Sequence, residues 1–233
     1  MKKVSILLIT LFFSIITIAC NNSTNAMSNN KENVKNSENS SKPEASVTTN
    51  ITNKEVNSKA LVIYSSFIGE QYSVGVIEKG NTEIVADMII EKTGADRFKV
   101  EPKVDNYPKD SYKRLTEIAS EELHNNARPE IQDVNFDISK YDTIFIGAPV
   151  WWGDFPMIMY TLFEKVDMNG KTIVPFSTHG GSGLSGFDSK LKRLYPNATI
   201  TKGLAVTGTD TQKKKEKVKS EVENWINSLN IAK

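Results

Sequence analysis

Three short loops of this 233-residue chain combine residue types that suit a phosphate and a flat aromatic ring. The first ends in Gly80, Asn81 and Thr82, directly before an apolar-periodic segment that predicts a helix. A helix N-terminus offers free N–H groups and partial positive charge, which suit a phosphate. Gly80 would let the backbone approach that phosphate closely. Asn and Thr are also ordinary helix caps, so plain capping explains the same residues.

The second loop, "APVWWGDFP" at 148–156, holds two of the three tryptophans directly after a strand-like run. Large apolar side chains are usually buried in strands and helices, and a loop is where such surface meets a ligand. Trp151 and Trp152 could therefore flank a flat ring at the edge of a sheet. Alternatively, one indole packs beneath a helix and the other covers the sheet edge.

The third loop, "STHGGSG" at 177–183, has three glycines in seven residues. The glycines leave room for a ligand against the backbone, although a flexible loop without a ligand would have the same glycine-rich sequence. His179 lies beside serines in this loop, which also suggests a site for hydrolysis by a serine nucleophile. That chemistry is disfavoured, because Leu184 stands where the serine elbow G-x-S-x-G needs its last glycine, and no acidic partner is placed for His179.

The elements that must position these loops alternate between strand and helix from residue 59 onward. The predicted strands are 59–66, 96–102, 141–149, 171–178 and 199–208, and the predicted helices are 81–94, 110–127, 157–166, 186–196 and 211–229. This alternation predicts an α/β fold with a doubly wound, five-stranded parallel sheet and helices on both faces. The order 2-1-3-4-5 then fits, with ligands bound at the carboxyl ends of the strands, near strands one and three.

Four segments resemble the flavodoxin-like proteins, and in particular their flavodoxin-4 branch. They are "IEKGNTEIVADMI", "ARPEI", "YDTIFIGAPVWWGDFPM" and "GKTIVPFSTHGGSGLSGF", within residues 60 to about 208. The resemblance implies a flavodoxin-like fold that binds FMN. About 11 extra residues, near 68–78, lengthen the first loop relative to short-chain flavodoxins.

The same resemblance implies a set of cofactor-binding residues. The phosphate loop corresponds to Ser66, Gly80, Asn81 and Thr82; the aromatic loop to Pro149, Val150, Trp151, Trp152 and Gly153; and the third loop to Thr178, His179, Gly180 and Gly181. His179 is the one candidate catalytic residue, as a proton donor or charge partner of the flavin. A structural hydrogen bond that holds its loop is the alternative role.

Three functions remain open at this point. The first is a flavodoxin-type electron carrier that works with a redox partner protein. The second is an FMN-dependent reductase that passes hydride from a nicotinamide to a quinone or similar acceptor. The third is a lipoprotein that uses the fold as a non-catalytic binding module. A purified protein without yellow colour or FMN uptake would indicate the third, and NAD(P)H consumption with a quinone separates the first two.

The N-terminus has the pattern of a secretory signal. Lys2 and Lys3 precede the apolar run 4–19, which is short for a membrane-spanning helix and stops at Cys20. "TIAC" resembles a bacterial lipobox, so residues 1–19 are predicted to be a signal peptide and Cys20 to be lipidated; an uncleaved anchor is the alternative. Residues 21–58 are polar, with no aromatic side chain, and predict a disordered linker. We therefore expect a domain at 59–233, held at the extracytoplasmic membrane surface by a lipid anchor.

Composition excludes several other classes. The chain has 39% hydrophobic and 24% charged residues and a net charge of +1, so it suits a globular domain and offers no charge bias toward nucleic acid. Cys20 is the sole cysteine, so no internal disulfide can form. The two histidines, His124 and His179, stand in no ligand-like cluster, and no metal site is predicted.

Overall fold

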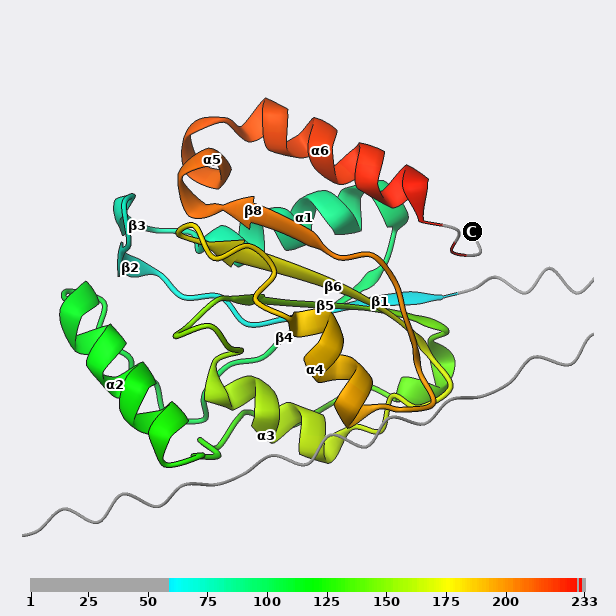
Figure 1. Ribbon diagram of the computed structural model, residues 1–233, viewed down its shortest axis with the longest axis horizontal. Helices are drawn as coiled ribbons and strands as arrows, with labels where there is room; N and C mark the ends of the chain where they lie inside the picture. The colour runs from blue at the N-terminus through cyan, green and yellow to red at the C-terminus, as the bar shows by residue number, and fades with distance from the viewer. Residues whose placement is uncertain (1–58, 230, 232–233) are drawn as a thin grey trace, which may run out of the picture. The chain divides into compact units, whose positions relative to one another are not determined.

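The computed structural model describes residues 59–229 and 231, which form an α/β domain around a parallel sheet (Figure 1). Its strands are β1 (Ala60–Tyr64), β4 (Asp96–Lys99), β5 (Thr143–Pro149), β6 (Thr172–His179), β7 (Thr199–Ile200) and β8 (Leu204–Thr207). The sheet runs in the order β4-β1-β5-β6-β7, and β8 also pairs with β6. In terms of the predicted strands this is 2-1-3-4-5, so the predicted flavodoxin-like fold is confirmed.

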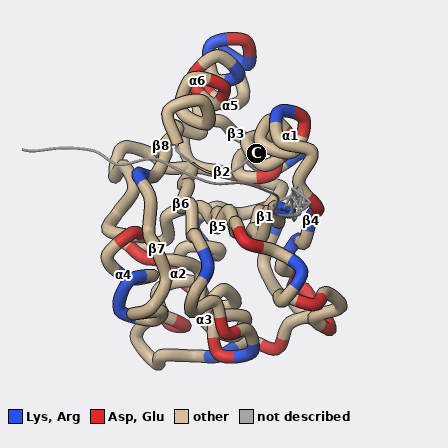
Figure 2. The backbone as a smooth tube through the Cα atoms, turned by 90° about the vertical axis from the view of Figure 1, so that its right-hand side faces the viewer, with Lys and Arg blue, Asp and Glu red and all other residues tan. Residues whose placement is uncertain are grey.

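Helices cover both faces of the sheet, as Figure 1 shows. They are α1 (Asn81–Thr93), α2 (Tyr112–His124), α3 (Met157–Lys165), α4 (Phe187–Leu194), α5 (Gly208–Lys213) and α6 (Lys215–Ser228), with a short 3-10 turn, η1, at Ile138–Lys140. α1, α5 and α6 lie on one side, and α3 and α4 on the other. Charged residues gather on the helices and loops, and the central strands carry none (Figure 2).

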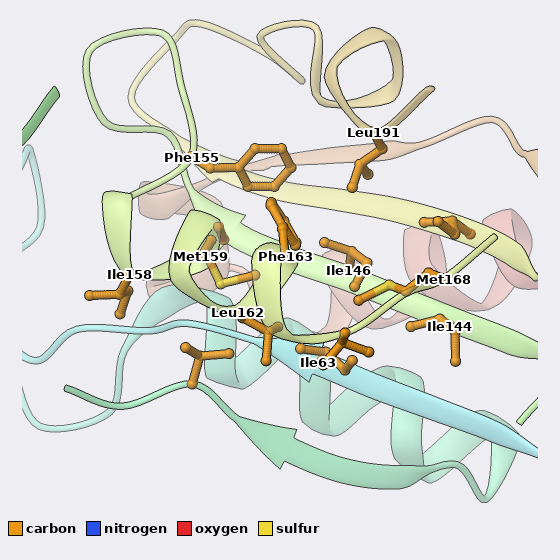
Figure 3. Close-up of a cluster of buried hydrophobic side chains, with 14 of the residues drawn as sticks. Ile63, Ile144, Ile146, Phe155, Ile158, Met159, Leu162, Phe163, Met168 and Leu191 are labelled. Atoms are coloured by element: carbon orange, nitrogen blue, oxygen red, sulfur yellow. The ribbon is translucent and has the colours of Figure 1, made fainter. Parts of the chain in front are cut away.

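The central strands are buried because successive side chains enter opposite cores. Along β5, Ile144 and Ile146 join the core under α3 and α4, whereas Phe145 joins the core under α1 and α6. Figure 3 shows the first of these cores, in which Ile158 and Leu162 of α3 pack toward the sheet. The nearly unbroken apolar run of β5 is thus explained by burial on both faces.

Helix α1 has the limits that the sequence indicates. It begins after Gly80, and it ends at Gly94, whose φ of 69° is left-handed and whose N–H donates to the Ile90 carbonyl over 2.8 Å. Such a C-terminal glycine closes a helix at little steric cost. Ile84 and Ile89 on its inner face are buried.

The predicted strand 199–208 is wrong as a single strand. It is two short strands, because the register with β6 moves from Ile173 beside Ile200 to Phe176 beside Leu204, which leaves one extra residue on the outer side. Pro175 lies in the intervening stretch of β6, and proline has no N–H to donate to the ladder. The extra residue is therefore accommodated as a bulge at this point.

The predicted final helix 211–229 is also divided. Thr207 caps α5 by accepting the Asp210 N–H over 3.1 Å, so a helix starts directly at the end of β8. The chain then leaves helical geometry at Lys214, with φ −134° and ψ 51°, before α6 begins. No glycine or proline marks this break, so local sequence gave no signal of it.

The insertion near 68–78 is a hairpin of two antiparallel strands, β2 (Gly69–Gln71) and β3 (Gly75–Ile77). It is fastened to the start of α2 through Glu70. The Glu70 N–H donates to the Lys109 carbonyl, and the Glu70 carboxylate accepts the Tyr112 N–H, both over 2.7 Å. The insertion therefore has a fixed place beside α2.

The predicted signal peptide, the lipidation site at Cys20 and the linker lie outside the described residues. Within residues 59–229, no helix combines the length and the apolar character needed to cross a bilayer.

Candidate functional site

A cavity of about 500 Å³ lies where the loops after β1, β5, β6 and β8 meet the start of α2. It is lined by Gln71, Tyr72, Asn81, Tyr112, Pro149, Val150, Trp151, Thr178, His179, Gly180, Gly181, Ser182 and Gly208. This is the carboxyl edge of the sheet, where parallel α/β folds bind ligands, and the volume suits a small molecule. None of the lining side chains is a Lys, Arg, Asp or Glu.

Of the predicted phosphate loop, Asn81 lines the cavity, as the first residue of α1. Its Oδ1 accepts a hydrogen bond from Gln212 Nε2 over 2.8 Å, which fixes the orientation of the amide. Gly208 faces this amide so closely that a Cβ there would lie 2.7 Å from Asn81 Nδ2. A side chain at residue 208 would therefore displace the Asn81 amide from its place at the cavity.

Ser66, Gly80 and Thr82 build the turn into α1 and do not line the cavity. The Ser66 hydroxyl accepts the Glu83 N–H over 3.0 Å, so it caps the helix. A side chain at Gly80 would collide with that same hydroxyl. Thr82 is 1% exposed, and its hydroxyl lies 2.8 Å from the Thr178 hydroxyl, which belongs to a cavity residue.

Ser65, one residue before Ser66, has an unusual hydroxyl. Among the described residues, its Oγ is the buried side-chain polar atom that has no hydrogen-bond partner. An unpaired buried hydroxyl costs free energy, so such an atom in a native fold calls for an explanation.

The two tryptophans of the second loop separate. Trp151 lines the 500 Å³ cavity and packs on the ring of Phe67, with centroids 4.3 Å apart. Trp152 and Gly153 occupy the centre of a tight turn with positive φ angles of 50° and 77°, closed by reciprocal 2.9 Å backbone bonds between Trp151 and Asp154. Trp152 therefore points elsewhere, is 61% exposed, and lines a separate cavity.

The four predicted residues of the third loop, Thr178 to Gly181, all line the cavity. His179 Nδ1 accepts the Gly181 N–H over 2.9 Å, so it holds the loop. Burial lowers the pKa of His179 below its ordinary value, which favours the neutral ring at physiological pH. With Nδ1 as acceptor, the neutral ring carries its hydrogen on Nε2, so His179 is a neutral donor rather than a charge partner.

Sequence reasoning missed part of the lining, namely Gln71, Tyr72, Tyr112, Ser182 and Gly208. Tyr72 sits in the turn of the inserted hairpin, and its ring centroid is 5.9 Å from that of Tyr112. A Cβ at Gly180 would lie 2.5 Å from the Tyr72 ring, so the glycine lets the two segments touch. Nothing in the sequence links Tyr72, in the insertion, with Tyr112, which lies beyond α1 and β4 at the start of α2.

Metal binding finds no support in residues 59–229: no group of three or more His, Cys, Asp or Glu side chains is placed to hold an ion.

A doubly wound parallel sheet with an aromatic and glycine-lined cavity at its carboxyl edge defines a protein of the flavodoxin-like class. Residues 73–229 match the flavodoxin-4 family model, described as flavodoxin, and the chain belongs to this family. No curated protein sequence matches the chain.

Three solved structures resemble the domain. A Bacteroides eggerthii protein assigned as a flavoprotein has 27% identity and a TM-score of 0.59, over 76% of this chain and 100% of that one. A Bacteroides uniformis protein assigned likewise has 26% identity and a TM-score of 0.56, over 73% and 99%. A Lactobacillus acidophilus flavoprotein in complex with FMN has 26% identity and a TM-score of 0.51, over 67% and 97%.

Proposed function

We propose that the protein binds FMN in the 500 Å³ cavity and works as a flavodoxin-type electron carrier. The observation that carries this proposal is the convergence of the α1 N-terminus, three aromatic rings and the glycine-rich third loop on one cavity. Membership of the flavodoxin family and the FMN complex of the Lactobacillus acidophilus relative support it.

The residues present fit such a cofactor. At Gly180 and Gly208 a Cβ would collide with Tyr72 or Asn81, so the two glycines let these cavity-lining side chains approach the backbone closely. Ser65 directly follows β1 at the carboxyl edge of the sheet; it does not line the cavity, and its buried hydroxyl lacks a protein partner. The cavity is uncharged, so a phosphate would be held by N–H groups, hydroxyls and the dipole of α1 rather than by a cation.

Bound FMN would supply reversible one- and two-electron transfer. The protein's part is to bind and orient it. Asn81 and Thr178 would hold the phosphate end, since they flank the first turn of α1. Tyr72, Tyr112 and Trp151 would flank the flat ring, and His179 would donate a hydrogen bond from Nε2 without bringing a charge.

The absorbance spectrum of the purified protein tests this proposal. We expect a flavin spectrum on isolation, or its appearance as added FMN is taken up to one equivalent per chain. A colourless protein that takes up no FMN would instead support the non-catalytic binding module.

A reductase that passes hydride from NAD(P)H to a quinone is the second candidate. One observation favours it: a further cavity, of a volume that suits a small molecule, adjoins the first. NAD(P)H oxidation that depends on both FMN and a quinone would establish this activity, and a protein that exchanges electrons only with another protein would be a carrier.

We further propose that the domain is held at the extracytoplasmic face of the membrane by a lipid on Cys20. The support is the basic start, the apolar run and the position of the sole cysteine. Replacing Cys20 with serine should release the protein from membranes or stall its processing. Unchanged membrane fractionation and mobility of Cys20→Ser would indicate an uncleaved anchor.

A further inference from the structure

A second cavity, of about 330 Å³, lies between α2 and the tight turn Trp151–Asp154. It is lined by Tyr112, Leu115, Thr116, Ala119, Val150, Trp151 and Trp152. Tyr112, Val150 and Trp151 line the 500 Å³ cavity as well, so the two cavities adjoin at these three residues. A molecule in the second cavity would thus lie next to a molecule in the first.

Trp152 lines this cavity in a strained backbone conformation. Its φ of 50° is unfavourable for a bulky side chain, and 61% of its surface is exposed. Its indole N–H donates to the Thr116 carbonyl over 2.9 Å, so the ring is tethered to α2 with its polar atom already satisfied. What remains available to a ligand is the apolar face of the indole. An exposed aromatic ring kept in a strained turn indicates a binding role.

The lining indicates the chemistry of the ligand. No charged side chain lines the second cavity, and the Tyr112 N–H at the start of α2 already donates to the Glu70 carboxylate, so the lining does not favour the diphosphate of a nicotinamide dinucleotide. Thr116 already donates its hydroxyl to the Lys113 carbonyl over 2.7 Å and can only accept. Burial raises the pKa of Tyr112, so its phenol keeps its proton and can donate to a carbonyl oxygen. Apolar walls with one such donor suit a neutral, flat ring that carries carbonyl groups.

We propose that the second cavity binds a neutral planar ring of the quinone class. Its assignment as the site of the small redox partner rests on the proposed FMN function, but binding of the ring itself does not. Ala119 and Thr116 are the positions to change, since they line this cavity and not the first. Both lie on α2, whose helical backbone accepts either substitution.

The test is equilibrium dialysis of the protein against menadione, a small naphthoquinone, with and without FMN. Thr116→Glu places a charge in the cavity and Ala119→Leu fills it, so each should weaken menadione binding by about tenfold or more. Thr116→Val keeps the shape and stays neutral, and should bind menadione within about twofold of wild type. All three variants should melt cooperatively and bind FMN as wild type does, which reports on the fold.

Menadione that binds wild type, Thr116→Glu and Ala119→Leu equally, or that does not bind wild type, would overturn the proposal. Displacement of menadione by FMN, one for one, would place it in the first cavity and also overturn it. Displacement by NADH would contradict the assigned ligand class. Menadione binding that is lost in Thr116→Glu, in a protein that takes up no FMN, would support the second cavity and refute the FMN function instead.

Discussion

The hydroxyl oxygens of Thr82 and Thr178 lie 2.8 Å apart, which joins the first turn of α1 to the end of β6. Thr178 lines the 500 Å³ cavity, and Thr82 stands behind it, almost fully buried. When Thr82 donates to Thr178, the Thr178 hydroxyl keeps its own hydrogen for a ligand. The pair therefore assigns ligand contact to Thr178 and a supporting role to Thr82.

Replacing Thr178 with valine should weaken FMN binding by about tenfold or more and leave riboflavin binding nearly unchanged. A hydrogen bond to a charged group contributes about 1.5–3 kcal/mol, and riboflavin has no phosphate to lose it. Thr82→Val should show a smaller effect of the same kind. Fluorescence titration with both flavins measures this, and equal weakening of the two flavins would mean that the threonine pair only holds the fold together.

Replacing Ser65 with alanine should have opposite effects on the free and the loaded protein. Its unpaired buried hydroxyl costs free energy in the free protein, so Ser65→Ala should raise the free energy of unfolding by about 1 kcal/mol. If the hydroxyl serves FMN, affinity for FMN should fall. Urea unfolding with and without FMN measures both quantities, and Ser66→Ala, which removes a helix cap, is the matched control that should destabilise the free protein. A Ser65→Ala variant less stable than wild type would rule this explanation out.

Adding a methyl group at Gly180 should weaken FMN binding through Tyr72. The new Cβ would lie 2.5 Å from the Tyr72 ring, which is 56% exposed and free to move aside. Gly180→Ala should therefore keep the wild-type melting temperature and bind FMN less tightly. Tyr72→Ala removes the same ring directly. The double variant should bind FMN no more weakly than Tyr72→Ala alone, and a clear further loss would show that Gly180 acts independently of Tyr72.

The stability of the free protein should depend on pH through His179. Burial lowers the pKa of folded His179 below its ordinary 6.5, so the folded state binds fewer protons than the unfolded chain. The stability is then fully present above pH 6.5 and is lost as pH falls through the folded pKa. His179→Asn keeps an acceptor for the Gly181 N–H but does not titrate. Urea unfolding between pH 8 and 5 should show a smaller loss for this variant, and an equal loss would place the titration elsewhere.

The sheet could be predicted because its central strands are apolar on both faces, as Phe145 and Ile146 illustrate. The division of strand five could not, since it depends on Pro175 in a neighbouring strand. Within 199–208 the local sign is Gly203, between the two short strands, but a register shift is a property of paired strands and a lone glycine does not specify it.

The candidate site was predictable where a loop directly continues a strand. Thr178 and His179 end β6 and reach the cavity for that reason. The sequence does not show that the adjacent tryptophans line different cavities. The backbone geometry of the turn decides that Trp151 lines the first cavity and Trp152 the second. Tyr72 was missed since its hairpin is placed by contacts with α2, which are distant in sequence.

The central claim is that FMN binds in the 500 Å³ cavity, and an FMN titration of wild type, Trp151→Ala and Trp152→Ala tests it most directly. Trp151 lines that cavity, whereas Trp152 lines only its neighbour. We predict one FMN per chain, about tenfold or greater weakening in Trp151→Ala, and a change within about threefold in Trp152→Ala. No saturable binding by wild type, or a greater loss in Trp152→Ala than in Trp151→Ala, would contradict the account.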